Sequence, residues 1–406
     1  MYVSDLPRIS RQFSQRSVME AIVQGGPISR ASISKLTGLS KQTISEIVRG
    51  LEQEGWVQET GRTSGHVGRT AVTYELVHDA AYIIAVDLGG TKVRVALTDL
   101  ACQIFAEAAT PTDPRGGQFV IDQIAALAFQ AAARERIPRK KIRLAVIGAP
   151  GAPDPATGRI LLAPNIAGFD AMNVLDAFEK ALGVAVMIEN DVNLAVLGEN
   201  WLGQGQGIDN LAYIALGTGV GSGLMLGGHL VRGATHAAGE IGFMPIGADP
   251  FAAESLRTGA FERAVATHAM TERYRSLTGA QVAVPAIFEN AAAGDKAALT
   301  VLDETARYLA QGIAAIAAVA NPEKVILGGS IGLRPEILSR VKALMPLCFP
   351  YPVTVEAGEL GARAALIGAA AIGLGQLHNT LFGVDAPDGR ISLPTAQAAA
   401  LKEVVL

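Results

Sequence analysis

The chain has 406 residues, of which half are hydrophobic, 45 are glycines and 5% are aromatic. This length predicts two or three domains, and the composition is typical of α/β proteins. The net charge of −4 excludes a global attraction to nucleic acid, and two cysteines exclude a disulfide framework or a cysteine-rich zinc site.

Three short helices are predicted near the N-terminus. The first covers about residues 12–24, the second follows Ser29 and ends at Gly38, and the third follows Ser40 and ends at Gly55. A serine before a helix can cap its free amide groups, and a glycine after it permits the turn that ends it.

The third helix has one apolar stripe, which leaves a small polar face outward. A helix, a tight glycine-containing turn and such a helix form a helix-turn-helix, whose second helix enters the major groove with its N-terminus first. Seven basic residues against two acidic ones between positions 8 and 49 supply the local charge. The residues of this helix expected to contact DNA are Ser40, Lys41, Gln42, Thr43, Ser45 and Arg49.

Two strands, near residues 56–60 and 72–76, flank a glycine-rich segment and predict a wing. Arg62 and Arg69 on this wing suit a phosphate or minor-groove contact. The alternative is a small helical protein-interaction module with an ordinary solvated charged face.

Residues 26–45 and 51–57, with the pair Gly68-Arg69, resemble the N-terminal winged helix of transcriptional regulators of the ROK (repressor, ORF, kinase) family. The resemblance assigns residues 1–80 to a winged helix-turn-helix domain whose partner is operator DNA. We expect a homodimer, or a higher homo-oligomer, on an inverted repeat, because operator symmetry mirrors protein symmetry.

A strand that ends at Asp87 is followed by the turn Gly89-Gly90-Thr91-Lys92 and a second strand. Two glycines allow a tight turn whose amides can approach phosphate, and Thr91 and Lys92 could add donors. Asp87 could hold Mg²⁺ through water. An ordinary hairpin is the alternative reading of this pattern.

A short buried strand at residues 185–188 runs into a helix through Glu189-Asn190-Asp191. Open α/β sheets bind their ligands at such carboxyl ends of strands. A carboxylate here can accept a proton from a sugar hydroxyl, and a neighbouring amide can orient that hydroxyl. Alternatively, Asn190 and Asp191 merely cap the helix.

Two further glycine turns follow strands, Gly217-Thr218-Gly219 and Gly328-Gly329. The turn at Gly89, the strand end at Asp191 and the turns at Gly217 and Gly328, in this order, resemble the layout of the actin-like, hexokinase-type ATPase fold. Over about residues 82–375 the body resembles the ROK family. This implies an α/β, two-lobed domain at 81–375, with lobes of about 81–195 and 196–375, and ATP with Mg²⁺ as cofactors only if kinase activity is retained.

The resemblance also implies a sugar site. Asp191 corresponds to the sugar-facing carboxylate that is the general base in the family's kinases, and Asn190 stands beside it. The sugar-binding set implied in this way is Asn165, Asn190, Asp191, Glu240 and Glu262. Such a cluster suits a polyhydroxylated ligand, because each buried hydroxyl needs a partner.

The chain departs from the family at its zinc motif. Phe243 stands at the usual histidine, and the three cysteine positions are Ala253, Ser255 and Ala260. All four zinc ligands are absent together, so we expect no zinc, and no residue is assigned as a metal ligand of this loop. Apolar packing is expected to hold the loop instead, through Phe243, Phe251 and Phe261.

These features predict a sugar-responsive transcriptional regulator, with repression implied by resemblance, that binds a sugar or sugar phosphate in its body. The alternative is an active ATP-dependent sugar kinase with an accessory N-terminal module. The N-terminus lacks an apolar targeting segment, so we expect a cytoplasmic protein without membrane contact. Residues 376–406 are expected to be an extension beyond the family body, with a helix possible at 395–404.

Overall fold

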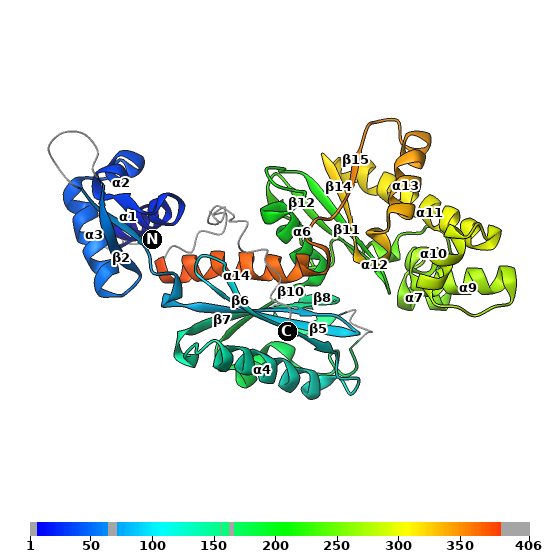
Figure 1. The fold of residues 1–406 in the computed structure, drawn as a ribbon, viewed down its shortest axis with the longest axis horizontal. Helices are drawn as coiled ribbons and strands as arrows, with labels where there is room; N and C mark the ends of the chain where they lie inside the picture. Colours follow the sequence, from blue (N-terminus) through cyan, green and yellow to red (C-terminus); the bar gives the residue numbers. More distant parts are fainter. Residues whose placement is uncertain (1–5, 64–70, 155, 162–165, 383–406) are drawn as a thin grey trace.

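The computed structural model describes residues 6–63, 71–154, 156–161 and 166–382. An N-terminal domain lies beside a body of two lobes, each built on a five-stranded sheet (Figure 1). The N-terminal domain has three helices and an antiparallel sheet in the order β1-β3-β2. Its elements are α1 (Leu6–Gly25), β1 (Ile28–Ser29), α2 (Arg30–Thr37), α3 (Lys41–Gln53), β2 (Val57–Thr63) and β3 (Ala71–Leu76).

Serine caps begin the second and third helices, as predicted. The Ser29 hydroxyl accepts from the amide of Ser32 at 3.2 Å, and the Ser40 hydroxyl accepts from the amide of Thr43 at 3.1 Å. α1 begins earlier than predicted, and β1 was not predicted. β1 has only two residues and forms because it pairs with β3. It is too short to show the alternation of apolar and polar residues that predicts a strand.

The first lobe contains a sheet in the order β10-β7-β4-β5-β6, in which β10, β7 and β4 are parallel. Both faces are covered, which explains the continuous apolar sequence of β4. Ile84 and Val86 pack with α4 and α5, whereas Ile83 and Ala85 point to the opposite face. The elements are β4 (Tyr82–Leu88), β5 (Lys92–Asp99), β6 (Ile104–Pro111), α4 (Gly117–Arg134), β7 (Ile142–Ala149), α5 (Val174–Leu182) and β10 (Ala185–Asn190), with a small hairpin of β8 (Ala152–Asp154) and β9 (Arg159–Leu161).

The second lobe contains a sheet in the order β13-β12-β11-β14-β15. Ile214 of its central strand packs with the outer helices, whereas Tyr213 packs with α6 on the inner face. The elements are α6 (Asp191–Leu202), β11 (Leu211–Leu216), β12 (Val220–Leu226), β13 (His229–Leu230), α7 (Ala253–Thr258), α8 (Glu262–Val265), α9 (Thr267–Thr278), α10 (Val284–Ala292), α11 (Lys296–Ala320), β14 (Lys324–Gly328), α12 (Gly329–Gly332), α13 (Pro335–Cys348) and β15 (Thr354–Ala357).

The helix α14 (Ala364–Phe382) differs from the prediction in two ways. It continues past the expected end of the body at residue 375, and it packs against β4 and β7, so the chain returns to the first lobe instead of ending in the second. Leu366 and Leu374, both fully buried, join the core on the inner face of the first sheet. The helix predicted at 395–404 lies outside the described residues.

α6 and α14 touch backbone to backbone. A side chain at Gly198 would overlap the carbonyl of Ala364, and one at Gly368 would overlap the carbonyl of Leu194. α6 also packs on β11 and β12 of the second sheet. The pair α6 and α14 therefore joins the two lobes (Figure 1).

The N-terminal domain shares its core with α14. Val18 and Ile22 of α1 belong to the same buried cluster as Leu374 and Leu377.

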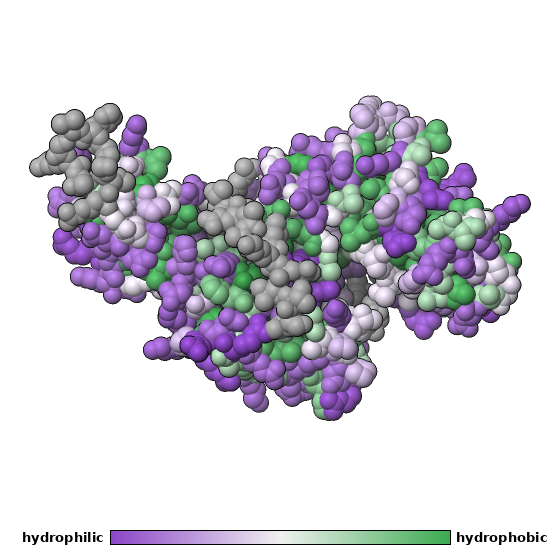
Figure 2. Space-filling model, in the orientation of Figure 1, coloured by the Kyte–Doolittle hydropathy of each residue, from purple (hydrophilic) through white to green (hydrophobic). Residues whose placement is uncertain are grey.

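The visible surface of the N-terminal domain is largely hydrophilic (Figure 2). Within the described residues, no helix is both long and apolar enough to cross a membrane.

Candidate functional site

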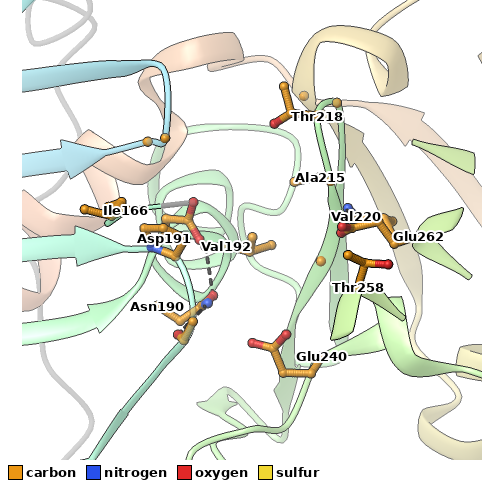
Figure 3. Close-up of a pocket in the computed structure, with 18 of the residues that line it drawn as sticks. Ile166, Asn190, Asp191, Val192, Ala215, Thr218, Val220, Glu240, Thr258 and Glu262 are labelled. Atoms are coloured by element: carbon orange, nitrogen blue, oxygen red, sulfur yellow. Dashed lines mark hydrogen bonds between the residues drawn. The ribbon is translucent and has the colours of Figure 1, made fainter. Parts of the chain in front are cut away.

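A cleft of about 830 Å³ lies between the two lobes. All three glycine turns contribute to its lining, and so does the N-terminus of α6. In Figure 3, Asn190 and Asp191 lie on one wall, and Glu240, Thr258 and Glu262 lie on the opposite wall. The cleft is therefore the place where polar groups from both sheets face a common space.

Asn190 is the N-cap of α6, as the capping alternative proposed. Its side-chain oxygen accepts from the amides of Val192 and Asn193 at 2.9 and 3.0 Å, and its side-chain nitrogen donates to the carbonyl of Gly151 at 3.0 Å. Most of its hydrogen-bonding capacity is thus used within the protein. The cap holds the first turn of α6 in place, which positions the next residue in the cleft.

Asp191 lines the cleft at the start of α6, and its carboxylate accepts from the amide of Val192 at 2.9 Å. Burial, together with the nearby charges of Asp87 and Glu240, raises the pKa of Asp191 to about 7. A carboxyl group with this pKa can exchange a proton with a bound hydroxyl near neutral pH.

Glu240 and Glu262 stand across the cleft from Asp191 (Figure 3). Burial raises the pKa of both, and the charge of Glu262 raises the pKa of Glu240 further. Glu262 also accepts from the amide of Val220 at 3.0 Å. Four of the five predicted sugar-site residues therefore line one cleft, and Asn165 lies outside the described residues.

Glu189 belongs to the polar strand end noted in the sequence, but no role was predicted for it. It is buried, and it accepts from Arg232 at 2.7 Å and from the side chain of Asn193 at 2.9 Å. The partner arginine lies far along the chain in the second lobe, so no local pattern identifies it. This ion pair links the end of β10 in the first sheet to the segment that follows β13 in the second.

The phosphate-type turns divide into residues that line the cleft and residues that do not. The lining ones are Gly89, Gly90, Thr91, Gly217, Thr218, Gly219 and Gly329. Lys92 begins β5 outside this lining, and Gly328 is packed against the ring of Tyr213, which leaves no room for a side chain. Asp87 is behind the lining, where it pairs with Arg94.

Arg94 lines the cleft and was missed in the sequence. It stands directly opposite Asp87 in the β4–β5 hairpin. The register of a hairpin across a short turn could have identified this neighbour, because facing residues share one side of the sheet.

On α3, the residues predicted to contact DNA form an exposed face. Lys41, Gln42 and Arg49 are exposed, whereas Thr43 and Ser45 are half-buried. The Ser40 hydroxyl caps the helix and contacts the Thr43 hydroxyl at 2.8 Å, and Gln42 donates to Glu46 at 3.2 Å. Arg62 belongs to β2, and Arg69 lies outside the described residues.

One buried ring and several hydrogen bonds hold the loop at the missing zinc motif. Phe261 is buried, as predicted, but Phe243 is 40% exposed and Phe251 is 88% exposed, so the predicted packing of these two rings is wrong. Instead, Arg263 donates to the buried hydroxyl of Ser255 at 2.6 Å, and the amide of Phe261 donates to the carbonyl of Gly242 at 3.0 Å. Phe243 lines the cleft rather than the loop's interior.

Comparison with known proteins gives matches over both parts of the chain. The ROK family model matches residues 83–375, and the MarR family model matches residues 5–69. A putative xylose repressor from Caldicellulosiruptor sp. is 28% identical over 381 residues, which cover 89% of this chain and 95% of that protein.

Two solved structures share the architecture. A ROK family transcriptional regulator, described as a homologue of the Escherichia coli MLC protein, has a TM-score of 0.75 and 24% identity, covering 92% of this chain and 98% of its own. A ROK family glucokinase from Streptomyces griseus, in complex with glucose and AMPPNP, has a TM-score of 0.62 and 28% identity, covering 72% and 99%. The first match includes the N-terminal domain, whereas the second spans less of this chain.

Proposed function

Because the chain belongs to the ROK family and carries a MarR-type winged helix before the family domain, we propose that it is a sugar-responsive transcriptional repressor. The winged helix binds operator DNA, and the cleft binds a sugar or sugar phosphate that changes operator affinity. The proposal includes a two-fold dimer acting in the cytoplasm on an inverted repeat.

The continuous core between the cleft and the winged helix carries this proposal. α6 starts in the cleft at Asp191, packs backbone to backbone on α14, and α14 shares a buried cluster with α1. A ligand that shifts α6 can therefore change the position of the DNA-binding domain through helices that are in direct contact. Packed interfaces of this kind convert small shifts into alternative arrangements.

The carboxylates of the cleft support a sugar as the ligand class. Asp191 directly follows the last residue of β10 in the first sheet, and Glu240 and Glu262 lie on the opposite wall, so that a ring between them can donate hydroxyl hydrogens to both walls. Hydrogen bonds to charged groups contribute about 1.5–3 kcal/mol each. A ligand that bridges the walls also favours one relative position of the lobes.

The DNA-binding part is tested on α3. Arg49→Ala and Gln42→Ala are expected to weaken operator binding by about 1–3 kcal/mol each if the side chain makes a bidentate base contact. Fluorescence anisotropy with operator and scrambled duplexes measures this loss. The matched control is Arg275→Ala, because Arg275 is exposed on α9 and pairs with Glu272. Unchanged operator affinity in both α3 variants would remove this helix from base recognition.

A sugar kinase is the second candidate function. Asp191 has a pKa suited to a general base, and the glycine turns line the same cleft. If the chain is a repressor only, the purified protein shows little or no sugar-dependent ATP hydrolysis. Robust phosphorylation of a sugar, abolished by Asp191→Asn, would establish the kinase instead.

We further propose that the chain folds and works without zinc. Phe243, Ala253, Ser255 and Ala260 offer no zinc ligand, and the hydrogen bonds of Ser255 and Phe261 hold the loop. Elemental analysis of purified protein is expected to find no stoichiometric zinc, and chelation is expected to leave the melting temperature unchanged. One tightly held zinc per chain would contradict this expectation.

A further inference from the structure

A strongly basic segment lies on the surface of the first lobe. It comprises residues 134–143, from the last residue of α4 to the second residue of β7, and we call it the basic segment. It holds six basic residues and one acidic residue, in a chain whose net charge is −4. Five of its basic side chains are exposed: Arg134, Arg136, Arg139, Lys140 and Arg143. The segment is therefore a second place, besides the helix-turn-helix, at which this acidic chain attracts a polyanion.

Most of the charge of the basic segment is not compensated by nearby carboxylates. Within the parts of the chain that the structure describes, Arg136, Lys140 and Arg143 form no ion pair, and the two ion pairs of the segment belong to other residues. By contrast, the exposed Arg273 and Arg275 of α9 each pair with a glutamate. Like charges held close together repel one another, and a bound anion relieves this repulsion.

Two contacts hold the basic segment in place. The guanidinium of Arg139 stacks on the ring of Phe129 in α4, with 3.7 Å between its carbon and the ring centre. The ammonium group of Lys141 donates to the carbonyl and to the carboxylate of Asp79, at 2.7 and 2.8 Å. Asp79 belongs to η2 (His78–Ala80), which lies between the N-terminal domain and β4. The second contact therefore ties the basic segment to the linker of the winged helix.

The basic segment lies at the end of the first lobe that carries the N-terminal domain (Figure 1). Ile142 of the segment pairs with Tyr82, the first residue of β4, so the two are neighbours at about 4.8 Å between strands. From Leu76, the last residue of the wing sheet, the chain reaches Tyr82 over at most about 20 Å. One turn of a DNA duplex is longer, at about 34 Å. The wing sheet and the basic segment are therefore less than one duplex turn apart.

The positions of the winged helix and the basic segment are also fixed relative to each other. α1 of the N-terminal domain shares a buried cluster with α14, and α14 packs on β4 and β7 of the first lobe. Charges on a surface held in this way meet a bound duplex in one register, whereas charges on a free tail would not. This location favours DNA over an acidic protein as the partner of the basic segment.

We propose that the basic segment is a second DNA contact, placed on the body, which binds the phosphate backbone beside the half-site that α3 reads. Lysine and arginine contacts to phosphates add affinity and fix the register of a protein on its duplex, but they carry no sequence information. This inference rests on the proposed function, because it adds a surface for the same DNA.

The salt dependence of DNA binding tests the inference. The probes are a duplex of about four helical turns, selected from a random pool with the full-length chain, and a scrambled duplex of the same length. Fluorescence anisotropy measures both affinities between about 50 and 200 mM salt. The variant combines Arg136→Gln, Lys140→Gln and Arg143→Gln, which remove three exposed charges that have no ion pair among the described residues.

The triple variant is expected to bind both duplexes about tenfold or more weakly and to keep the ratio of the two affinities within about twofold. Each lost phosphate contact lowers the slope of log affinity against log salt by about 0.9, so the slope should fall by about 2 to 3. In a hydroxyl-radical footprint, the variant should lose protection of the backbone beside the half-sites and keep protection of the half-sites themselves. The retained half-site protection also shows that the variant is folded.

A second triple variant is the charge-matched control. It combines Arg275→Gln, Arg307→Gln and Lys342→Gln, at exposed positions of the second lobe, and it is expected to leave the slope and the footprint unchanged. An equal loss in both triple variants would mean that net charge alone causes the effect, and would overturn the inference. An unchanged slope and footprint in the first variant would overturn it as well, and would leave an acidic protein as the partner of this surface.

The two duplexes separate this inference from the proposed function. If the selected duplex binds specifically and the first triple variant behaves as the native chain does, the repressor proposal stands and the second contact fails. If selection enriches no sequence, the repressor proposal fails, whereas the salt slope on the scrambled duplex still decides the basic segment. A chain that binds neither duplex would contradict both.

Discussion

Asp191→Asn is expected to keep operator binding but to lower the affinity for the effector about tenfold or more. The amide retains the size of the side chain and loses the charge that accepts a hydroxyl hydrogen. Such a charge-assisted bond contributes about 1.5–3 kcal/mol, which corresponds to roughly ten- to a hundredfold in affinity. Titration of the operator complex with the effector measures the shift. A full response in the variant would show that Asp191 does not contact the ligand.

The same substitution has a second, pH-dependent effect on stability. The pKa of Asp191 is raised from 3.8 to about 7 in the folded protein, so the folded state binds an extra proton between these values. The free energy of unfolding therefore falls as pH rises from about 4 to 7. The Asp191→Asn variant does not show this decrease, because the amide does not ionise. A difference of one pKa unit corresponds to about 1.4 kcal/mol, and water in the cleft reduces the effect. Between pH 5 and pH 8, the free energy of unfolding of the variant should therefore rise by up to about 3 kcal/mol relative to that of the native chain.

Urea unfolding at the two pH values measures this gain. Asp176→Asn serves as a control, because its carboxylate is at the exposed first turn of α5, where it pairs with Asn173. A stability difference between Asp191→Asn and the native chain that does not change with pH would mean that Asp191 is ionised in the folded protein well below pH 7.

Gly368→Ala is expected to destabilise the body by about 3 kcal/mol or more. A Cβ at this position would overlap the carbonyl of Leu194, so α14 must move away from α6. Overpacking of a close contact costs about 1–3 kcal/mol, and here the obstacle is backbone, which cannot change rotamer. The variant that remains folded should also lose part of its effector response, because α14 is the packed link to the winged helix.

Thermal and urea unfolding measure the first effect, and effector titration of the operator complex measures the second. Gly50→Ala is the matched control, because Gly50 lies inside α3 and a methyl group there would meet nothing within 4 Å. Removing a helical glycine there should stabilise the domain by about 0.5–1 kcal/mol. A Gly368→Ala variant as stable as the native chain would contradict the close contact of the two helices.

Features that depend on neighbours along the chain could be predicted from the amino-acid sequence. The caps at Ser29 and Ser40 and the end of α2 at Gly38 follow from hydrogen bonds and dihedral angles within a few residues. The strand, glycine turn and strand around Gly89 are equally local. Their order along the chain predicted the fold class and the two kinds of domain, because each turn follows a buried strand.

Electrostatic interactions between residues that are distant in the sequence became visible only in the folded chain. Asp191 and Glu240 are far apart in sequence, yet they share one cleft, and burial raises the pKa of both. The position of α14 was also not predictable from its own residues. It lies between β4 and α6 because both present apolar surfaces to it, and no pattern within α14 indicates that it returns to the first lobe. Phe243 and Phe251 are apolar but exposed, whereas Ser255, which accepts a hydrogen bond from Arg263, is buried. Burial and long-range pairing are properties of the assembled core, and a pattern of neighbours along the chain does not contain them.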